Sequence, residues 1–284
     1  MSPCKPIIVL GAERSGTSAC AEMVHAWGAY AGDPDELPVA DVLNPRGRWE
    51  YPPLWDLLAE IGGFAQGATW WAEDFPAKVA ARSADPEIAR RARALVDRMA
   101  APGRPWLWKD PALCHFLGFW RPFWPAPAFV VMVRHPVDIA VSWNQFRAAG
   151  GLAELSLHAN LLRWQHMMLS VLHAVGAGPT TLFAEYEAVT ADPPGQARRL
   201  ATFLDRQCAT ASDEGTVARM AEVCLPGLRR NRDGQRREEL MTPPQRSLYR
   251  FLRQKVQQPQ MPVTGDFPMP AGWRERVIRE ETLT

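Results

Sequence analysis

The sequence predicts an α/β fold in which a parallel sheet of four or five strands carries helices on both faces. The strand candidates are continuous apolar runs, which are typical of parallel strands buried on both sides. They alternate along the chain with segments of helical periodicity. A glycine-rich turn also joins the first apolar run to the first helix, as in P-loop-like folds. We therefore expect residues 1–284 to form one domain.

The individual elements follow from the same patterns. Strands are predicted over residues 6–10, 106–108, 128–133 and 180–183. Helices are predicted over residues 16–27, 54–61, 136–147 and 152–175, with three more starting at the Asp-Pro or Thr-Pro pairs of residues 85–86, 192–193 and 242–243. Residues 31–53 contain five prolines and are expected to form a loop. Beyond about residue 258 the sequence predicts a Pro-rich tail without helical periodicity.

Charge and cysteine content exclude several classes of function. The chain holds 32 Lys and Arg residues against 31 Asp and Glu residues, so its net charge of +1 provides no general attraction to nucleic acid or to an acidic membrane. No apolar stretch approaches the ~18 residues of a membrane span, and the run after Lys5 is too short for a signal peptide. The five cysteines form no C-x-x-C pair, which predicts reduced thiols in a cytoplasmic protein.

The first motif that carries chemistry runs from Gly11 to Ser18 and reads GAERSGTS. Its spacing matches a Walker A phosphate loop, but Thr17 stands where that loop has its lysine. Since the lysine reaches the β- and γ-phosphates of a nucleoside triphosphate, its absence argues against ATP or GTP hydrolysis. The curled backbone, the helix N-terminus and the Arg14 cation should still bind a phosphate or a sulfate.

The second motif follows the strand candidate 128–133 and reads RHPVDIAVS, from Arg134 to Ser142. Ligands of open α/β sheets bind at the carboxyl ends of the strands, where Arg134 is expected to lie. Ser142 comes about two helical turns later, so Arg134 and Ser142 can hold one phosphate from two sides. The alternative is that Arg134 pairs with Asp138 and that Ser142 is an ordinary helix residue.

Together the two motifs resemble those of the sulfotransferases that use 3′-phosphoadenosine 5′-phosphosulfate (PAPS). The sequence is similar in particular to a bacterial branch with RSGTS, NPxGxWE, WKDP and RHP motifs. These motifs appear here in order, within residues 14–18, 44–50, 106–111 and 134–136, and the similarity extends over about residues 6–230. One departure is Glu13, where this branch often has a neutral or basic residue. Its charge is expected to point away from the sulfate.

The resemblance implies a role for each motif residue. In that family the first motif binds the 5′-phosphosulfate end of PAPS and the second binds the 3′-phosphate. The implied donor-binding residues are Arg14, Ser15, Gly16, Thr17, Ser18, Arg134, Ser142, Tyr186 beside the adenine, and Arg229 or Arg230 in a late loop. Arg14 would also stabilise the leaving phosphate, and Lys109 would hold the sulfonyl oxygens. The alternative for Lys109 is a surface pair with Asp110.

An acceptor that receives the sulfuryl group must lose a proton. The family uses a glutamate or a histidine for this step. Glu50, at the end of the Pro-rich loop, is the first candidate for the base, and Glu36 is the second. The alternative for Glu50 is an ion pair with a neighbouring arginine. Three of the six histidines lie at near-heptad spacing without a carboxylate or cysteine at ligand distance, which predicts no metal site.

The sequence thus predicts a PAPS-dependent sulfotransferase that needs no metal. It would act on a hydroxyl or amine of a small molecule or glycan and release 3′-phosphoadenosine 5′-phosphate. The 12 tryptophans could stack on a sugar or an aromatic acceptor but do not name it. Two other functions stay open. A P-loop kinase for a small metabolite would need a Walker lysine and a Mg²⁺-binding Asp, and a non-catalytic module would bind the nucleotide without turnover.

Overall fold

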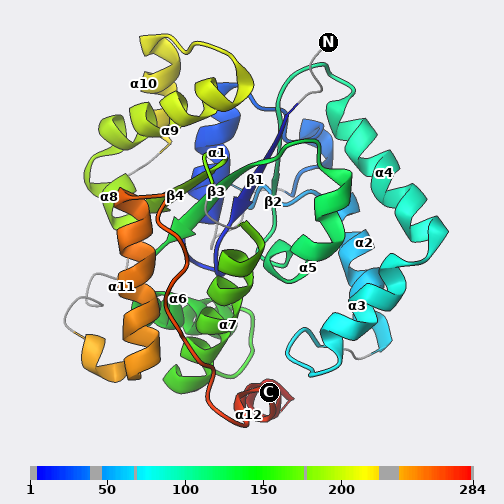
Figure 1. Cartoon of the computed structure of the whole chain (residues 1–284), viewed down its shortest axis with the longest axis vertical. Helices are drawn as coiled ribbons and strands as arrows, with labels where there is room; N and C mark the ends of the chain where they lie inside the picture. The colour runs from blue at the N-terminus through cyan, green and yellow to red at the C-terminus, as the bar shows by residue number, and fades with distance from the viewer. Residues whose placement is uncertain (1–4, 39–46, 67–68, 176–177, 224–236, 283–284) are drawn as a thin grey trace.

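The described part of the chain folds around a four-stranded parallel sheet. The structure is a computed structural model, and it describes residues 5–38, 47–66, 69–175, 178–223 and 237–282. The strands are β1 (Pro6–Leu10), β2 (Trp106–Lys109), β3 (Ala128–Val133) and β4 (Thr181–Glu185). Their spatial order is β2-β1-β3-β4, and all neighbouring strands run parallel (Figure 1). The predicted fold class and the predicted sheet are confirmed.

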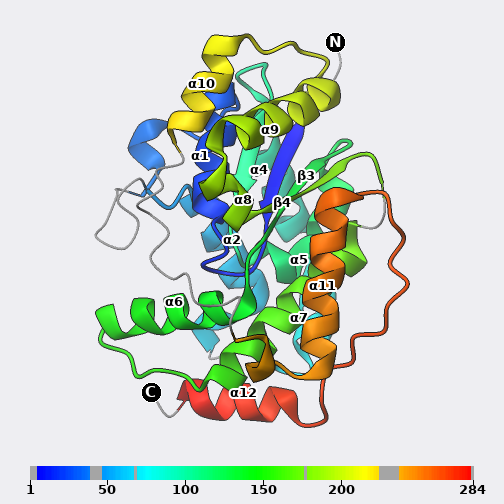
Figure 2. The same cartoon turned by 90° about the vertical axis from the view of Figure 1, so that its left-hand side faces the viewer.

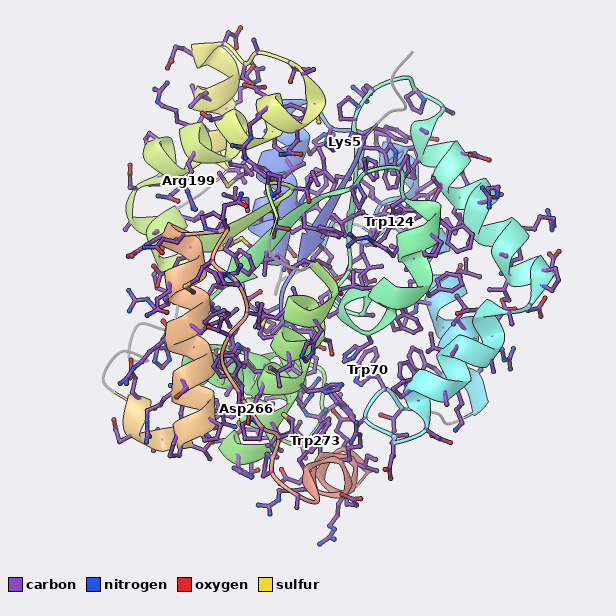
Figure 3. All side chains as sticks on the ribbon, in the orientation of Figure 1. Lys5, Trp70, Trp124, Arg199, Asp266 and Trp273 are labelled. Atoms are coloured by element: carbon purple, nitrogen blue, oxygen red, sulfur yellow. The ribbon has the colours of Figure 1, made fainter. Side chains whose placement is uncertain are left out.

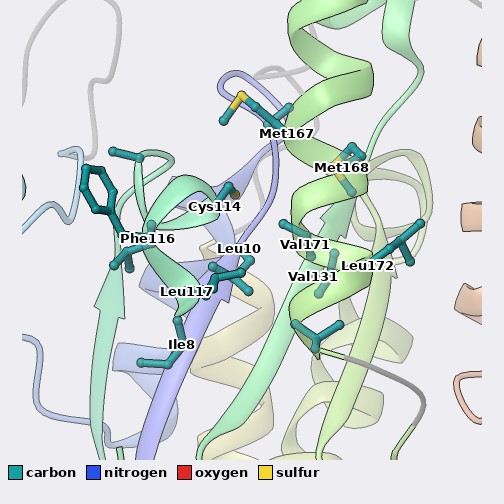
Figure 4. Close-up of a cluster of buried hydrophobic side chains, with 14 of the residues drawn as sticks. Ile8, Leu10, Cys114, Phe116, Leu117, Val131, Met167, Met168, Val171 and Leu172 are labelled. Carbon is teal, nitrogen blue, oxygen red and sulfur yellow. The ribbon is translucent and has the colours of Figure 1, made fainter. Parts of the chain in front are cut away.

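Two hydrophobic cores lie on the two faces of the sheet, because side chains alternate along each strand. Ile7 and Val9 of β1 belong to one core, whereas Ile8 and Leu10 belong to the other. The first core includes α1 (Thr17–Trp27), α8 (Tyr186–Ala191), α9 (Pro193–Cys208) and α10 (Glu214–Glu222). The second includes α2 (Pro52–Gly62), α3 (Phe75–Ser83), α4 (Pro86–Ala100), α5 (Leu113–Trp120), α6 (Pro136–Ala149), α7 (Leu157–Val175), α11 (Pro243–Gln257) and α12 (Trp273–Thr282). Figure 4 shows β1 packed against α5 and α7 in this second core.

All of the predicted helices are present, and one of them begins later than predicted. Helix α7 starts at Leu157 rather than at residue 152. Gly151 turns the chain with a φ of +74°, and the hydroxyl of Ser156 then accepts the N–H of Ala159 at 3.1 Å. This contact is a helix N-cap, so the regular helix begins only after it.

The sequence patterns missed α3, α5, α8, α10 and α12. The prediction of a tail without a helix is wrong for α12. Trp273 and Val277 are its two buried residues, four positions apart in a strongly charged segment, and so narrow an apolar stripe gives little periodicity. Figure 3 labels Trp273 beside α12. Its ring lies 4.6 Å from that of His166 in α7. In the described residues, no helix is both long enough and apolar enough to cross a membrane.

The turn between β1 and α1 requires glycine at position 16. Gly16 has a φ of +94° and precedes the first residue of α1. A Cβ atom at this position would lie 2.3 Å from Cδ2 of Tyr186, the residue that follows β4. The backbone of the turn therefore packs directly on the Tyr186 ring, which leaves no space for a side chain.

Gly16→Ala should lower the free energy of unfolding by more than the ~1–2 kcal/mol that a left-handed backbone costs a residue with a Cβ. The additional loss comes from displacement of the Tyr186 ring. Gly103→Ala is the matched control, because Gly103 has a φ of +73° and its added Cβ would meet nothing within 4 Å. Chemical denaturation of the two variants measures the difference. Equal losses would contradict the close packing of Gly16 on Tyr186.

Candidate active site

A cavity of about 300 Å³ lies where β1, β2 and β3 end. Pairing of Val9 with Lys109 and of Leu10 with Val131 brings these three strand ends side by side. Nine of the residues singled out from the sequence line the cavity: Arg14, Gly16, Thr17, Ser18, Glu50, Lys109, Arg134, Ser142 and Tyr186. The two sequence motifs therefore contribute to a single site.

The two motifs are also hydrogen-bonded to each other. Nη1 of Arg134 donates to the carbonyl oxygen of Arg14 at 2.7 Å. Nε of Arg14 donates to Oγ of Ser142 at 3.2 Å. Arg14 has a φ of +66°, which is rare for a residue with a Cβ and needs support from its surroundings. The bond from Arg134 gives part of that support.

Arg134 is buried and holds an unmatched donor. Its exposed fraction is 6%, and its Nε has no hydrogen-bond partner among the described residues. The guanidinium carbon lies 4.6 Å from the centre of the Tyr186 ring. A carboxylate oxygen of Glu187 accepts the backbone N–H of His135 at 3.3 Å, which ties the end of β3 to α8. Since an unmatched buried donor is costly, this environment suits an anionic ligand.

Lys109 and Glu50 form an ion pair in the cavity wall. Nζ of Lys109 lies 2.7 Å from Oε1 of Glu50, and the side chains are 3% and 28% exposed. The carbonyl of Arg48 accepts a second bond from Lys109 at 2.9 Å and one from the Ser18 hydroxyl at 3.3 Å. The segment that carries Glu50 is thereby held over the start of α1. Lys109 is thus a buried partner of Glu50 and not a surface lysine paired with Asp110.

Asp110 is a cavity residue that the sequence analysis treated only as a partner for Lys109. It is 4% exposed, and its Oδ1 accepts the N–H of Ala112 at 2.8 Å. Burial, with a further contribution from the Glu50 carboxylate, raises the pKa of Asp110 to about 7, although Lys109 acts in the opposite direction. The sequence feature that points to Asp110 is its position directly after the end of β2.

Aromatic side chains form the rest of the cavity wall. They are Trp55, which is 40% exposed, together with Trp70, Trp143 and Phe146. The guanidinium carbons of Arg14 and Arg48 each lie 5.5 Å from the centre of the Phe146 ring. Phe146 follows Ser142 by four residues in α6 and therefore shares its helix face. The sequence analysis did not single out Trp143 or Phe146.

Several other candidates lie elsewhere. Ser15 is fully buried in the turn between β1 and α1 and does not line the cavity, and its Oγ has no hydrogen-bond partner among the described residues. Glu36 is paired with Arg98 and also does not line the cavity. None of the six histidines lines it. Arg229, Arg230 and the start of the NPxGxWE motif fall outside the described residues. Within the described ranges, no group of three or more His, Cys, Asp or Glu side chains is placed to hold a metal ion.

Comparison with known proteins gave a family match and several distant structural likenesses. A model described as "Sulfotransferase family" matches residues 6–210. A comparison with curated proteins found no match. The solved sulfotransferase STF1 from Mycobacterium tuberculosis H37Rv aligns at 15% identity and a TM-score of 0.49, covering 90% of this chain and 77% of that one. The sulfotransferase domain from the curacin biosynthetic pathway aligns at 14% identity and a TM-score of 0.48, covering 89% of this chain and 98% of that domain. The sulfotransferase domain of the Synechococcus PCC 7002 olefin synthase aligns at 18% identity and a TM-score of 0.46. This alignment covers 100% of this chain and 95% of that domain.

Asp110→Asn should stabilise the protein more at pH 8 than at pH 5. Asparagine keeps an oxygen for the Ala112 N–H but cannot ionise. The pKa of Asp110 rises from 3.8 to about 7 on folding, so between these values the folded state holds a proton that the unfolded chain has released. Ionisation therefore costs stability progressively as the pH rises toward 7, and the variant removes that cost. Thermal unfolding at both pH values measures the effect, and an equal shift at both would contradict it.

Proposed function

Because the family model matches more than half of its length, this chain belongs to the sulfotransferase family, and we propose that its sulfuryl donor is PAPS. The proposed reaction moves the sulfuryl group to a hydroxyl or amine of a small molecule or glycan and releases 3′-phosphoadenosine 5′-phosphate. One observation supports this proposal most. Arg14 and Arg134 come from separate strand ends and meet in one cavity, and PAPS carries two separate anionic groups.

The phosphate loop would hold the 5′-phosphosulfate end of the donor. Thr17 and Ser18 begin α1, so their backbone N–H groups and the helix N-terminus favour an anion. Arg134 and Ser142 would hold the 3′-phosphate. The unmatched Nε donor of Arg134 supports this assignment. Tyr186 would contact the adenine, and Arg230 stays in the proposal as a further contact to the 3′-phosphate.

Each charged residue then has a role in the transfer. PAPS supplies the sulfuryl group, whose bond to the phosphate oxygen breaks as a bond to the acceptor oxygen or nitrogen forms. Arg14 would stabilise the negative charge that develops on the departing phosphate oxygen. Lys109 would donate to the sulfonyl oxygens. Glu50 would accept the proton that the acceptor loses.

Two contacts favour Glu50 over Glu36 as the base. The ammonium of Lys109, 2.7 Å away, orients the Glu50 carboxylate inside the cavity. Glu36 is bound to Arg98 instead and has no part in the cavity wall.

The alternatives are weakened but can be separated by one assay. The kinase alternative is disfavoured by the family match and by Arg134, which follows β3 where a Mg²⁺-binding Asp would be needed. A non-catalytic module would bind 3′-phosphoadenosine 5′-phosphate and transfer nothing. Incubating the protein with sulfur-labelled PAPS and an extract of its own cells tests both alternatives, because only a sulfotransferase would transfer the label to a component of the extract.

The aromatic walls formed by Trp55, Trp70 and Phe146 favour an acceptor with a sugar or an aromatic ring.

Arg134→Ala should weaken binding of 3′-phosphoadenosine 5′-phosphate by about 1.5–3 kcal/mol, the range for a hydrogen bond to a charged group. Adenosine 5′-phosphate, which lacks the 3′-phosphate, is the matched ligand and should lose much less. Its remaining loss would come from the missing bond to the Arg14 carbonyl. Calorimetric titration measures both affinities. Equal losses for the two ligands would overturn the 3′-phosphate assignment.

Glu50→Gln should lower kcat about 10²–10⁴-fold, the range for the loss of a general base, with little change in affinity for 3′-phosphoadenosine 5′-phosphate. Glutamine keeps an oxygen for the Lys109 ammonium but cannot take a proton. Glu36→Gln is the control and should turn over at close to the wild-type rate. Steady-state kinetics on the acceptor from the labelling assay measure both. An inactive Glu36→Gln beside an active Glu50→Gln would show that the wrong carboxylate was chosen.

A further inference from the structure

The phosphate loop contains an acid where it should attract an anion. Glu13 precedes Arg14 and lines the same cavity. A carboxylate close to a bound phosphate or sulfate repels it, and the repulsion is strongest where protein rather than water surrounds the charges. The loop can therefore bind an anion tightly only if the charge of Glu13 is neutralised.

Arg163 of α7 supplies the opposite charge. Its Nη2 lies 3.4 Å from Oε1 of Glu13, and its side chain is 5% exposed. The guanidinium carbon lies 4.3 Å from the ring centre of Trp143, a residue of the cavity wall. Arg163 itself is not a lining residue of the cavity. Arg163 therefore contacts Glu13 from outside the cavity lining and is not placed to contact a ligand in the cavity.

The C-terminal helix holds Arg163 from the other side. Oε1 of Glu281 lies 3.2 Å from Nε of Arg163, and Oε2 of Glu281 accepts the indole N–H of Trp71 at 2.9 Å. The neighbouring Glu280 accepts the backbone N–H and the hydroxyl of Ser156, each at 2.8 Å. Helix α12 thereby packs against α7 (Figure 2). It lies beyond residue 210, where the family match ends.

We propose that Arg163 is a positioning residue that neutralises Glu13, turns its carboxylate toward α7, and so allows the phosphate loop to accept the anionic end of the donor. Glu281 holds Arg163 in the orientation that this requires. The ligand class is a phosphate or sulfate ester, and in this respect the inference rests on the proposed function. Glu13 then serves as the point at which the loop is anchored to α7.

The test compares Arg163→Met with the double variant Glu13→Gln/Arg163→Met. Calorimetry measures binding of inorganic pyrophosphate, 3′-phosphoadenosine 5′-phosphate and uncharged adenosine. In Arg163→Met the Glu13 charge is no longer compensated by Arg163, so the affinity for both anions should fall at least about tenfold, which corresponds to ~1.4 kcal/mol. The double variant should restore both affinities to within about threefold of wild type, because no charge is then left uncompensated in the loop. Binding of adenosine should stay unchanged in both variants.

Three outcomes would overturn the proposal. They are wild-type anion affinity in Arg163→Met, no recovery in the double variant, and an equal loss of adenosine binding, which would show general damage to the site. Should Arg163→Met fail to fold, the same comparison is made in the Glu281→Gln background, where one carboxylate fewer is left unpaired. Wild-type protein that binds pyrophosphate but not 3′-phosphoadenosine 5′-phosphate would overturn the proposed function alone. Binding of neither anion would overturn both.

Discussion

The site depends on the hydrogen bond from Arg134 to the carbonyl of Arg14. The parallel register sets Leu10, the last residue of β1, opposite Val131, so β3 continues past the end of β1 to Val133 and delivers Arg134 beside the turn that carries Arg14. The bond also supports the left-handed backbone of Arg14, whose φ of +66° would cost about 1–2 kcal/mol without compensation. With that backbone fixed, the Arg14 side chain reaches Ser142 in α6. The two sequence motifs are therefore one hydrogen-bonded unit.

The charges around the cavity are unevenly distributed, although the chain as a whole is nearly neutral. Two of the cavity acids are compensated at contact distance, Glu50 by Lys109 and Glu13 by Arg163. Asp110 is held partly neutral because burial raises its pKa to about 7. Arg134 instead donates to a neutral carbonyl, and its Nε has no partner among the described residues. Positive charge is thus concentrated at the strand ends although the chain as a whole carries only +1.

Local patterns predicted the strands and the motif residues, whereas contacts between distant segments could not be predicted. Apolar runs and a glycine-rich turn are local signals, so β1, β3 and the residues from Arg14 to Ser18 were found. The pairing of Glu13 with Arg163 joins residues 150 positions apart, and no pattern in a single sequence indicates it. The raised pKa of Asp110 could not be predicted either, because it comes from burial in the folded chain. Helix α12 was missed because two buried residues define its inner face.

Helices α11 and α12 lie beyond the residues that the family model matches, and both contact residues that support the two motifs. Tyr249 of α11 packs its ring 4.9 Å from that of His135, the residue after Arg134. Glu281 of α12 reaches the phosphate loop through Arg163 and Glu13. Both sequence motifs are therefore supported by residues that follow position 210, although the motifs themselves lie before it. Because a ligand group must be held within a fraction of an ångström to act, these supporting contacts affect how well the same motif residues perform. Chains that share the motifs but differ in α11 and α12 should then differ in how firmly the motif residues are held in place.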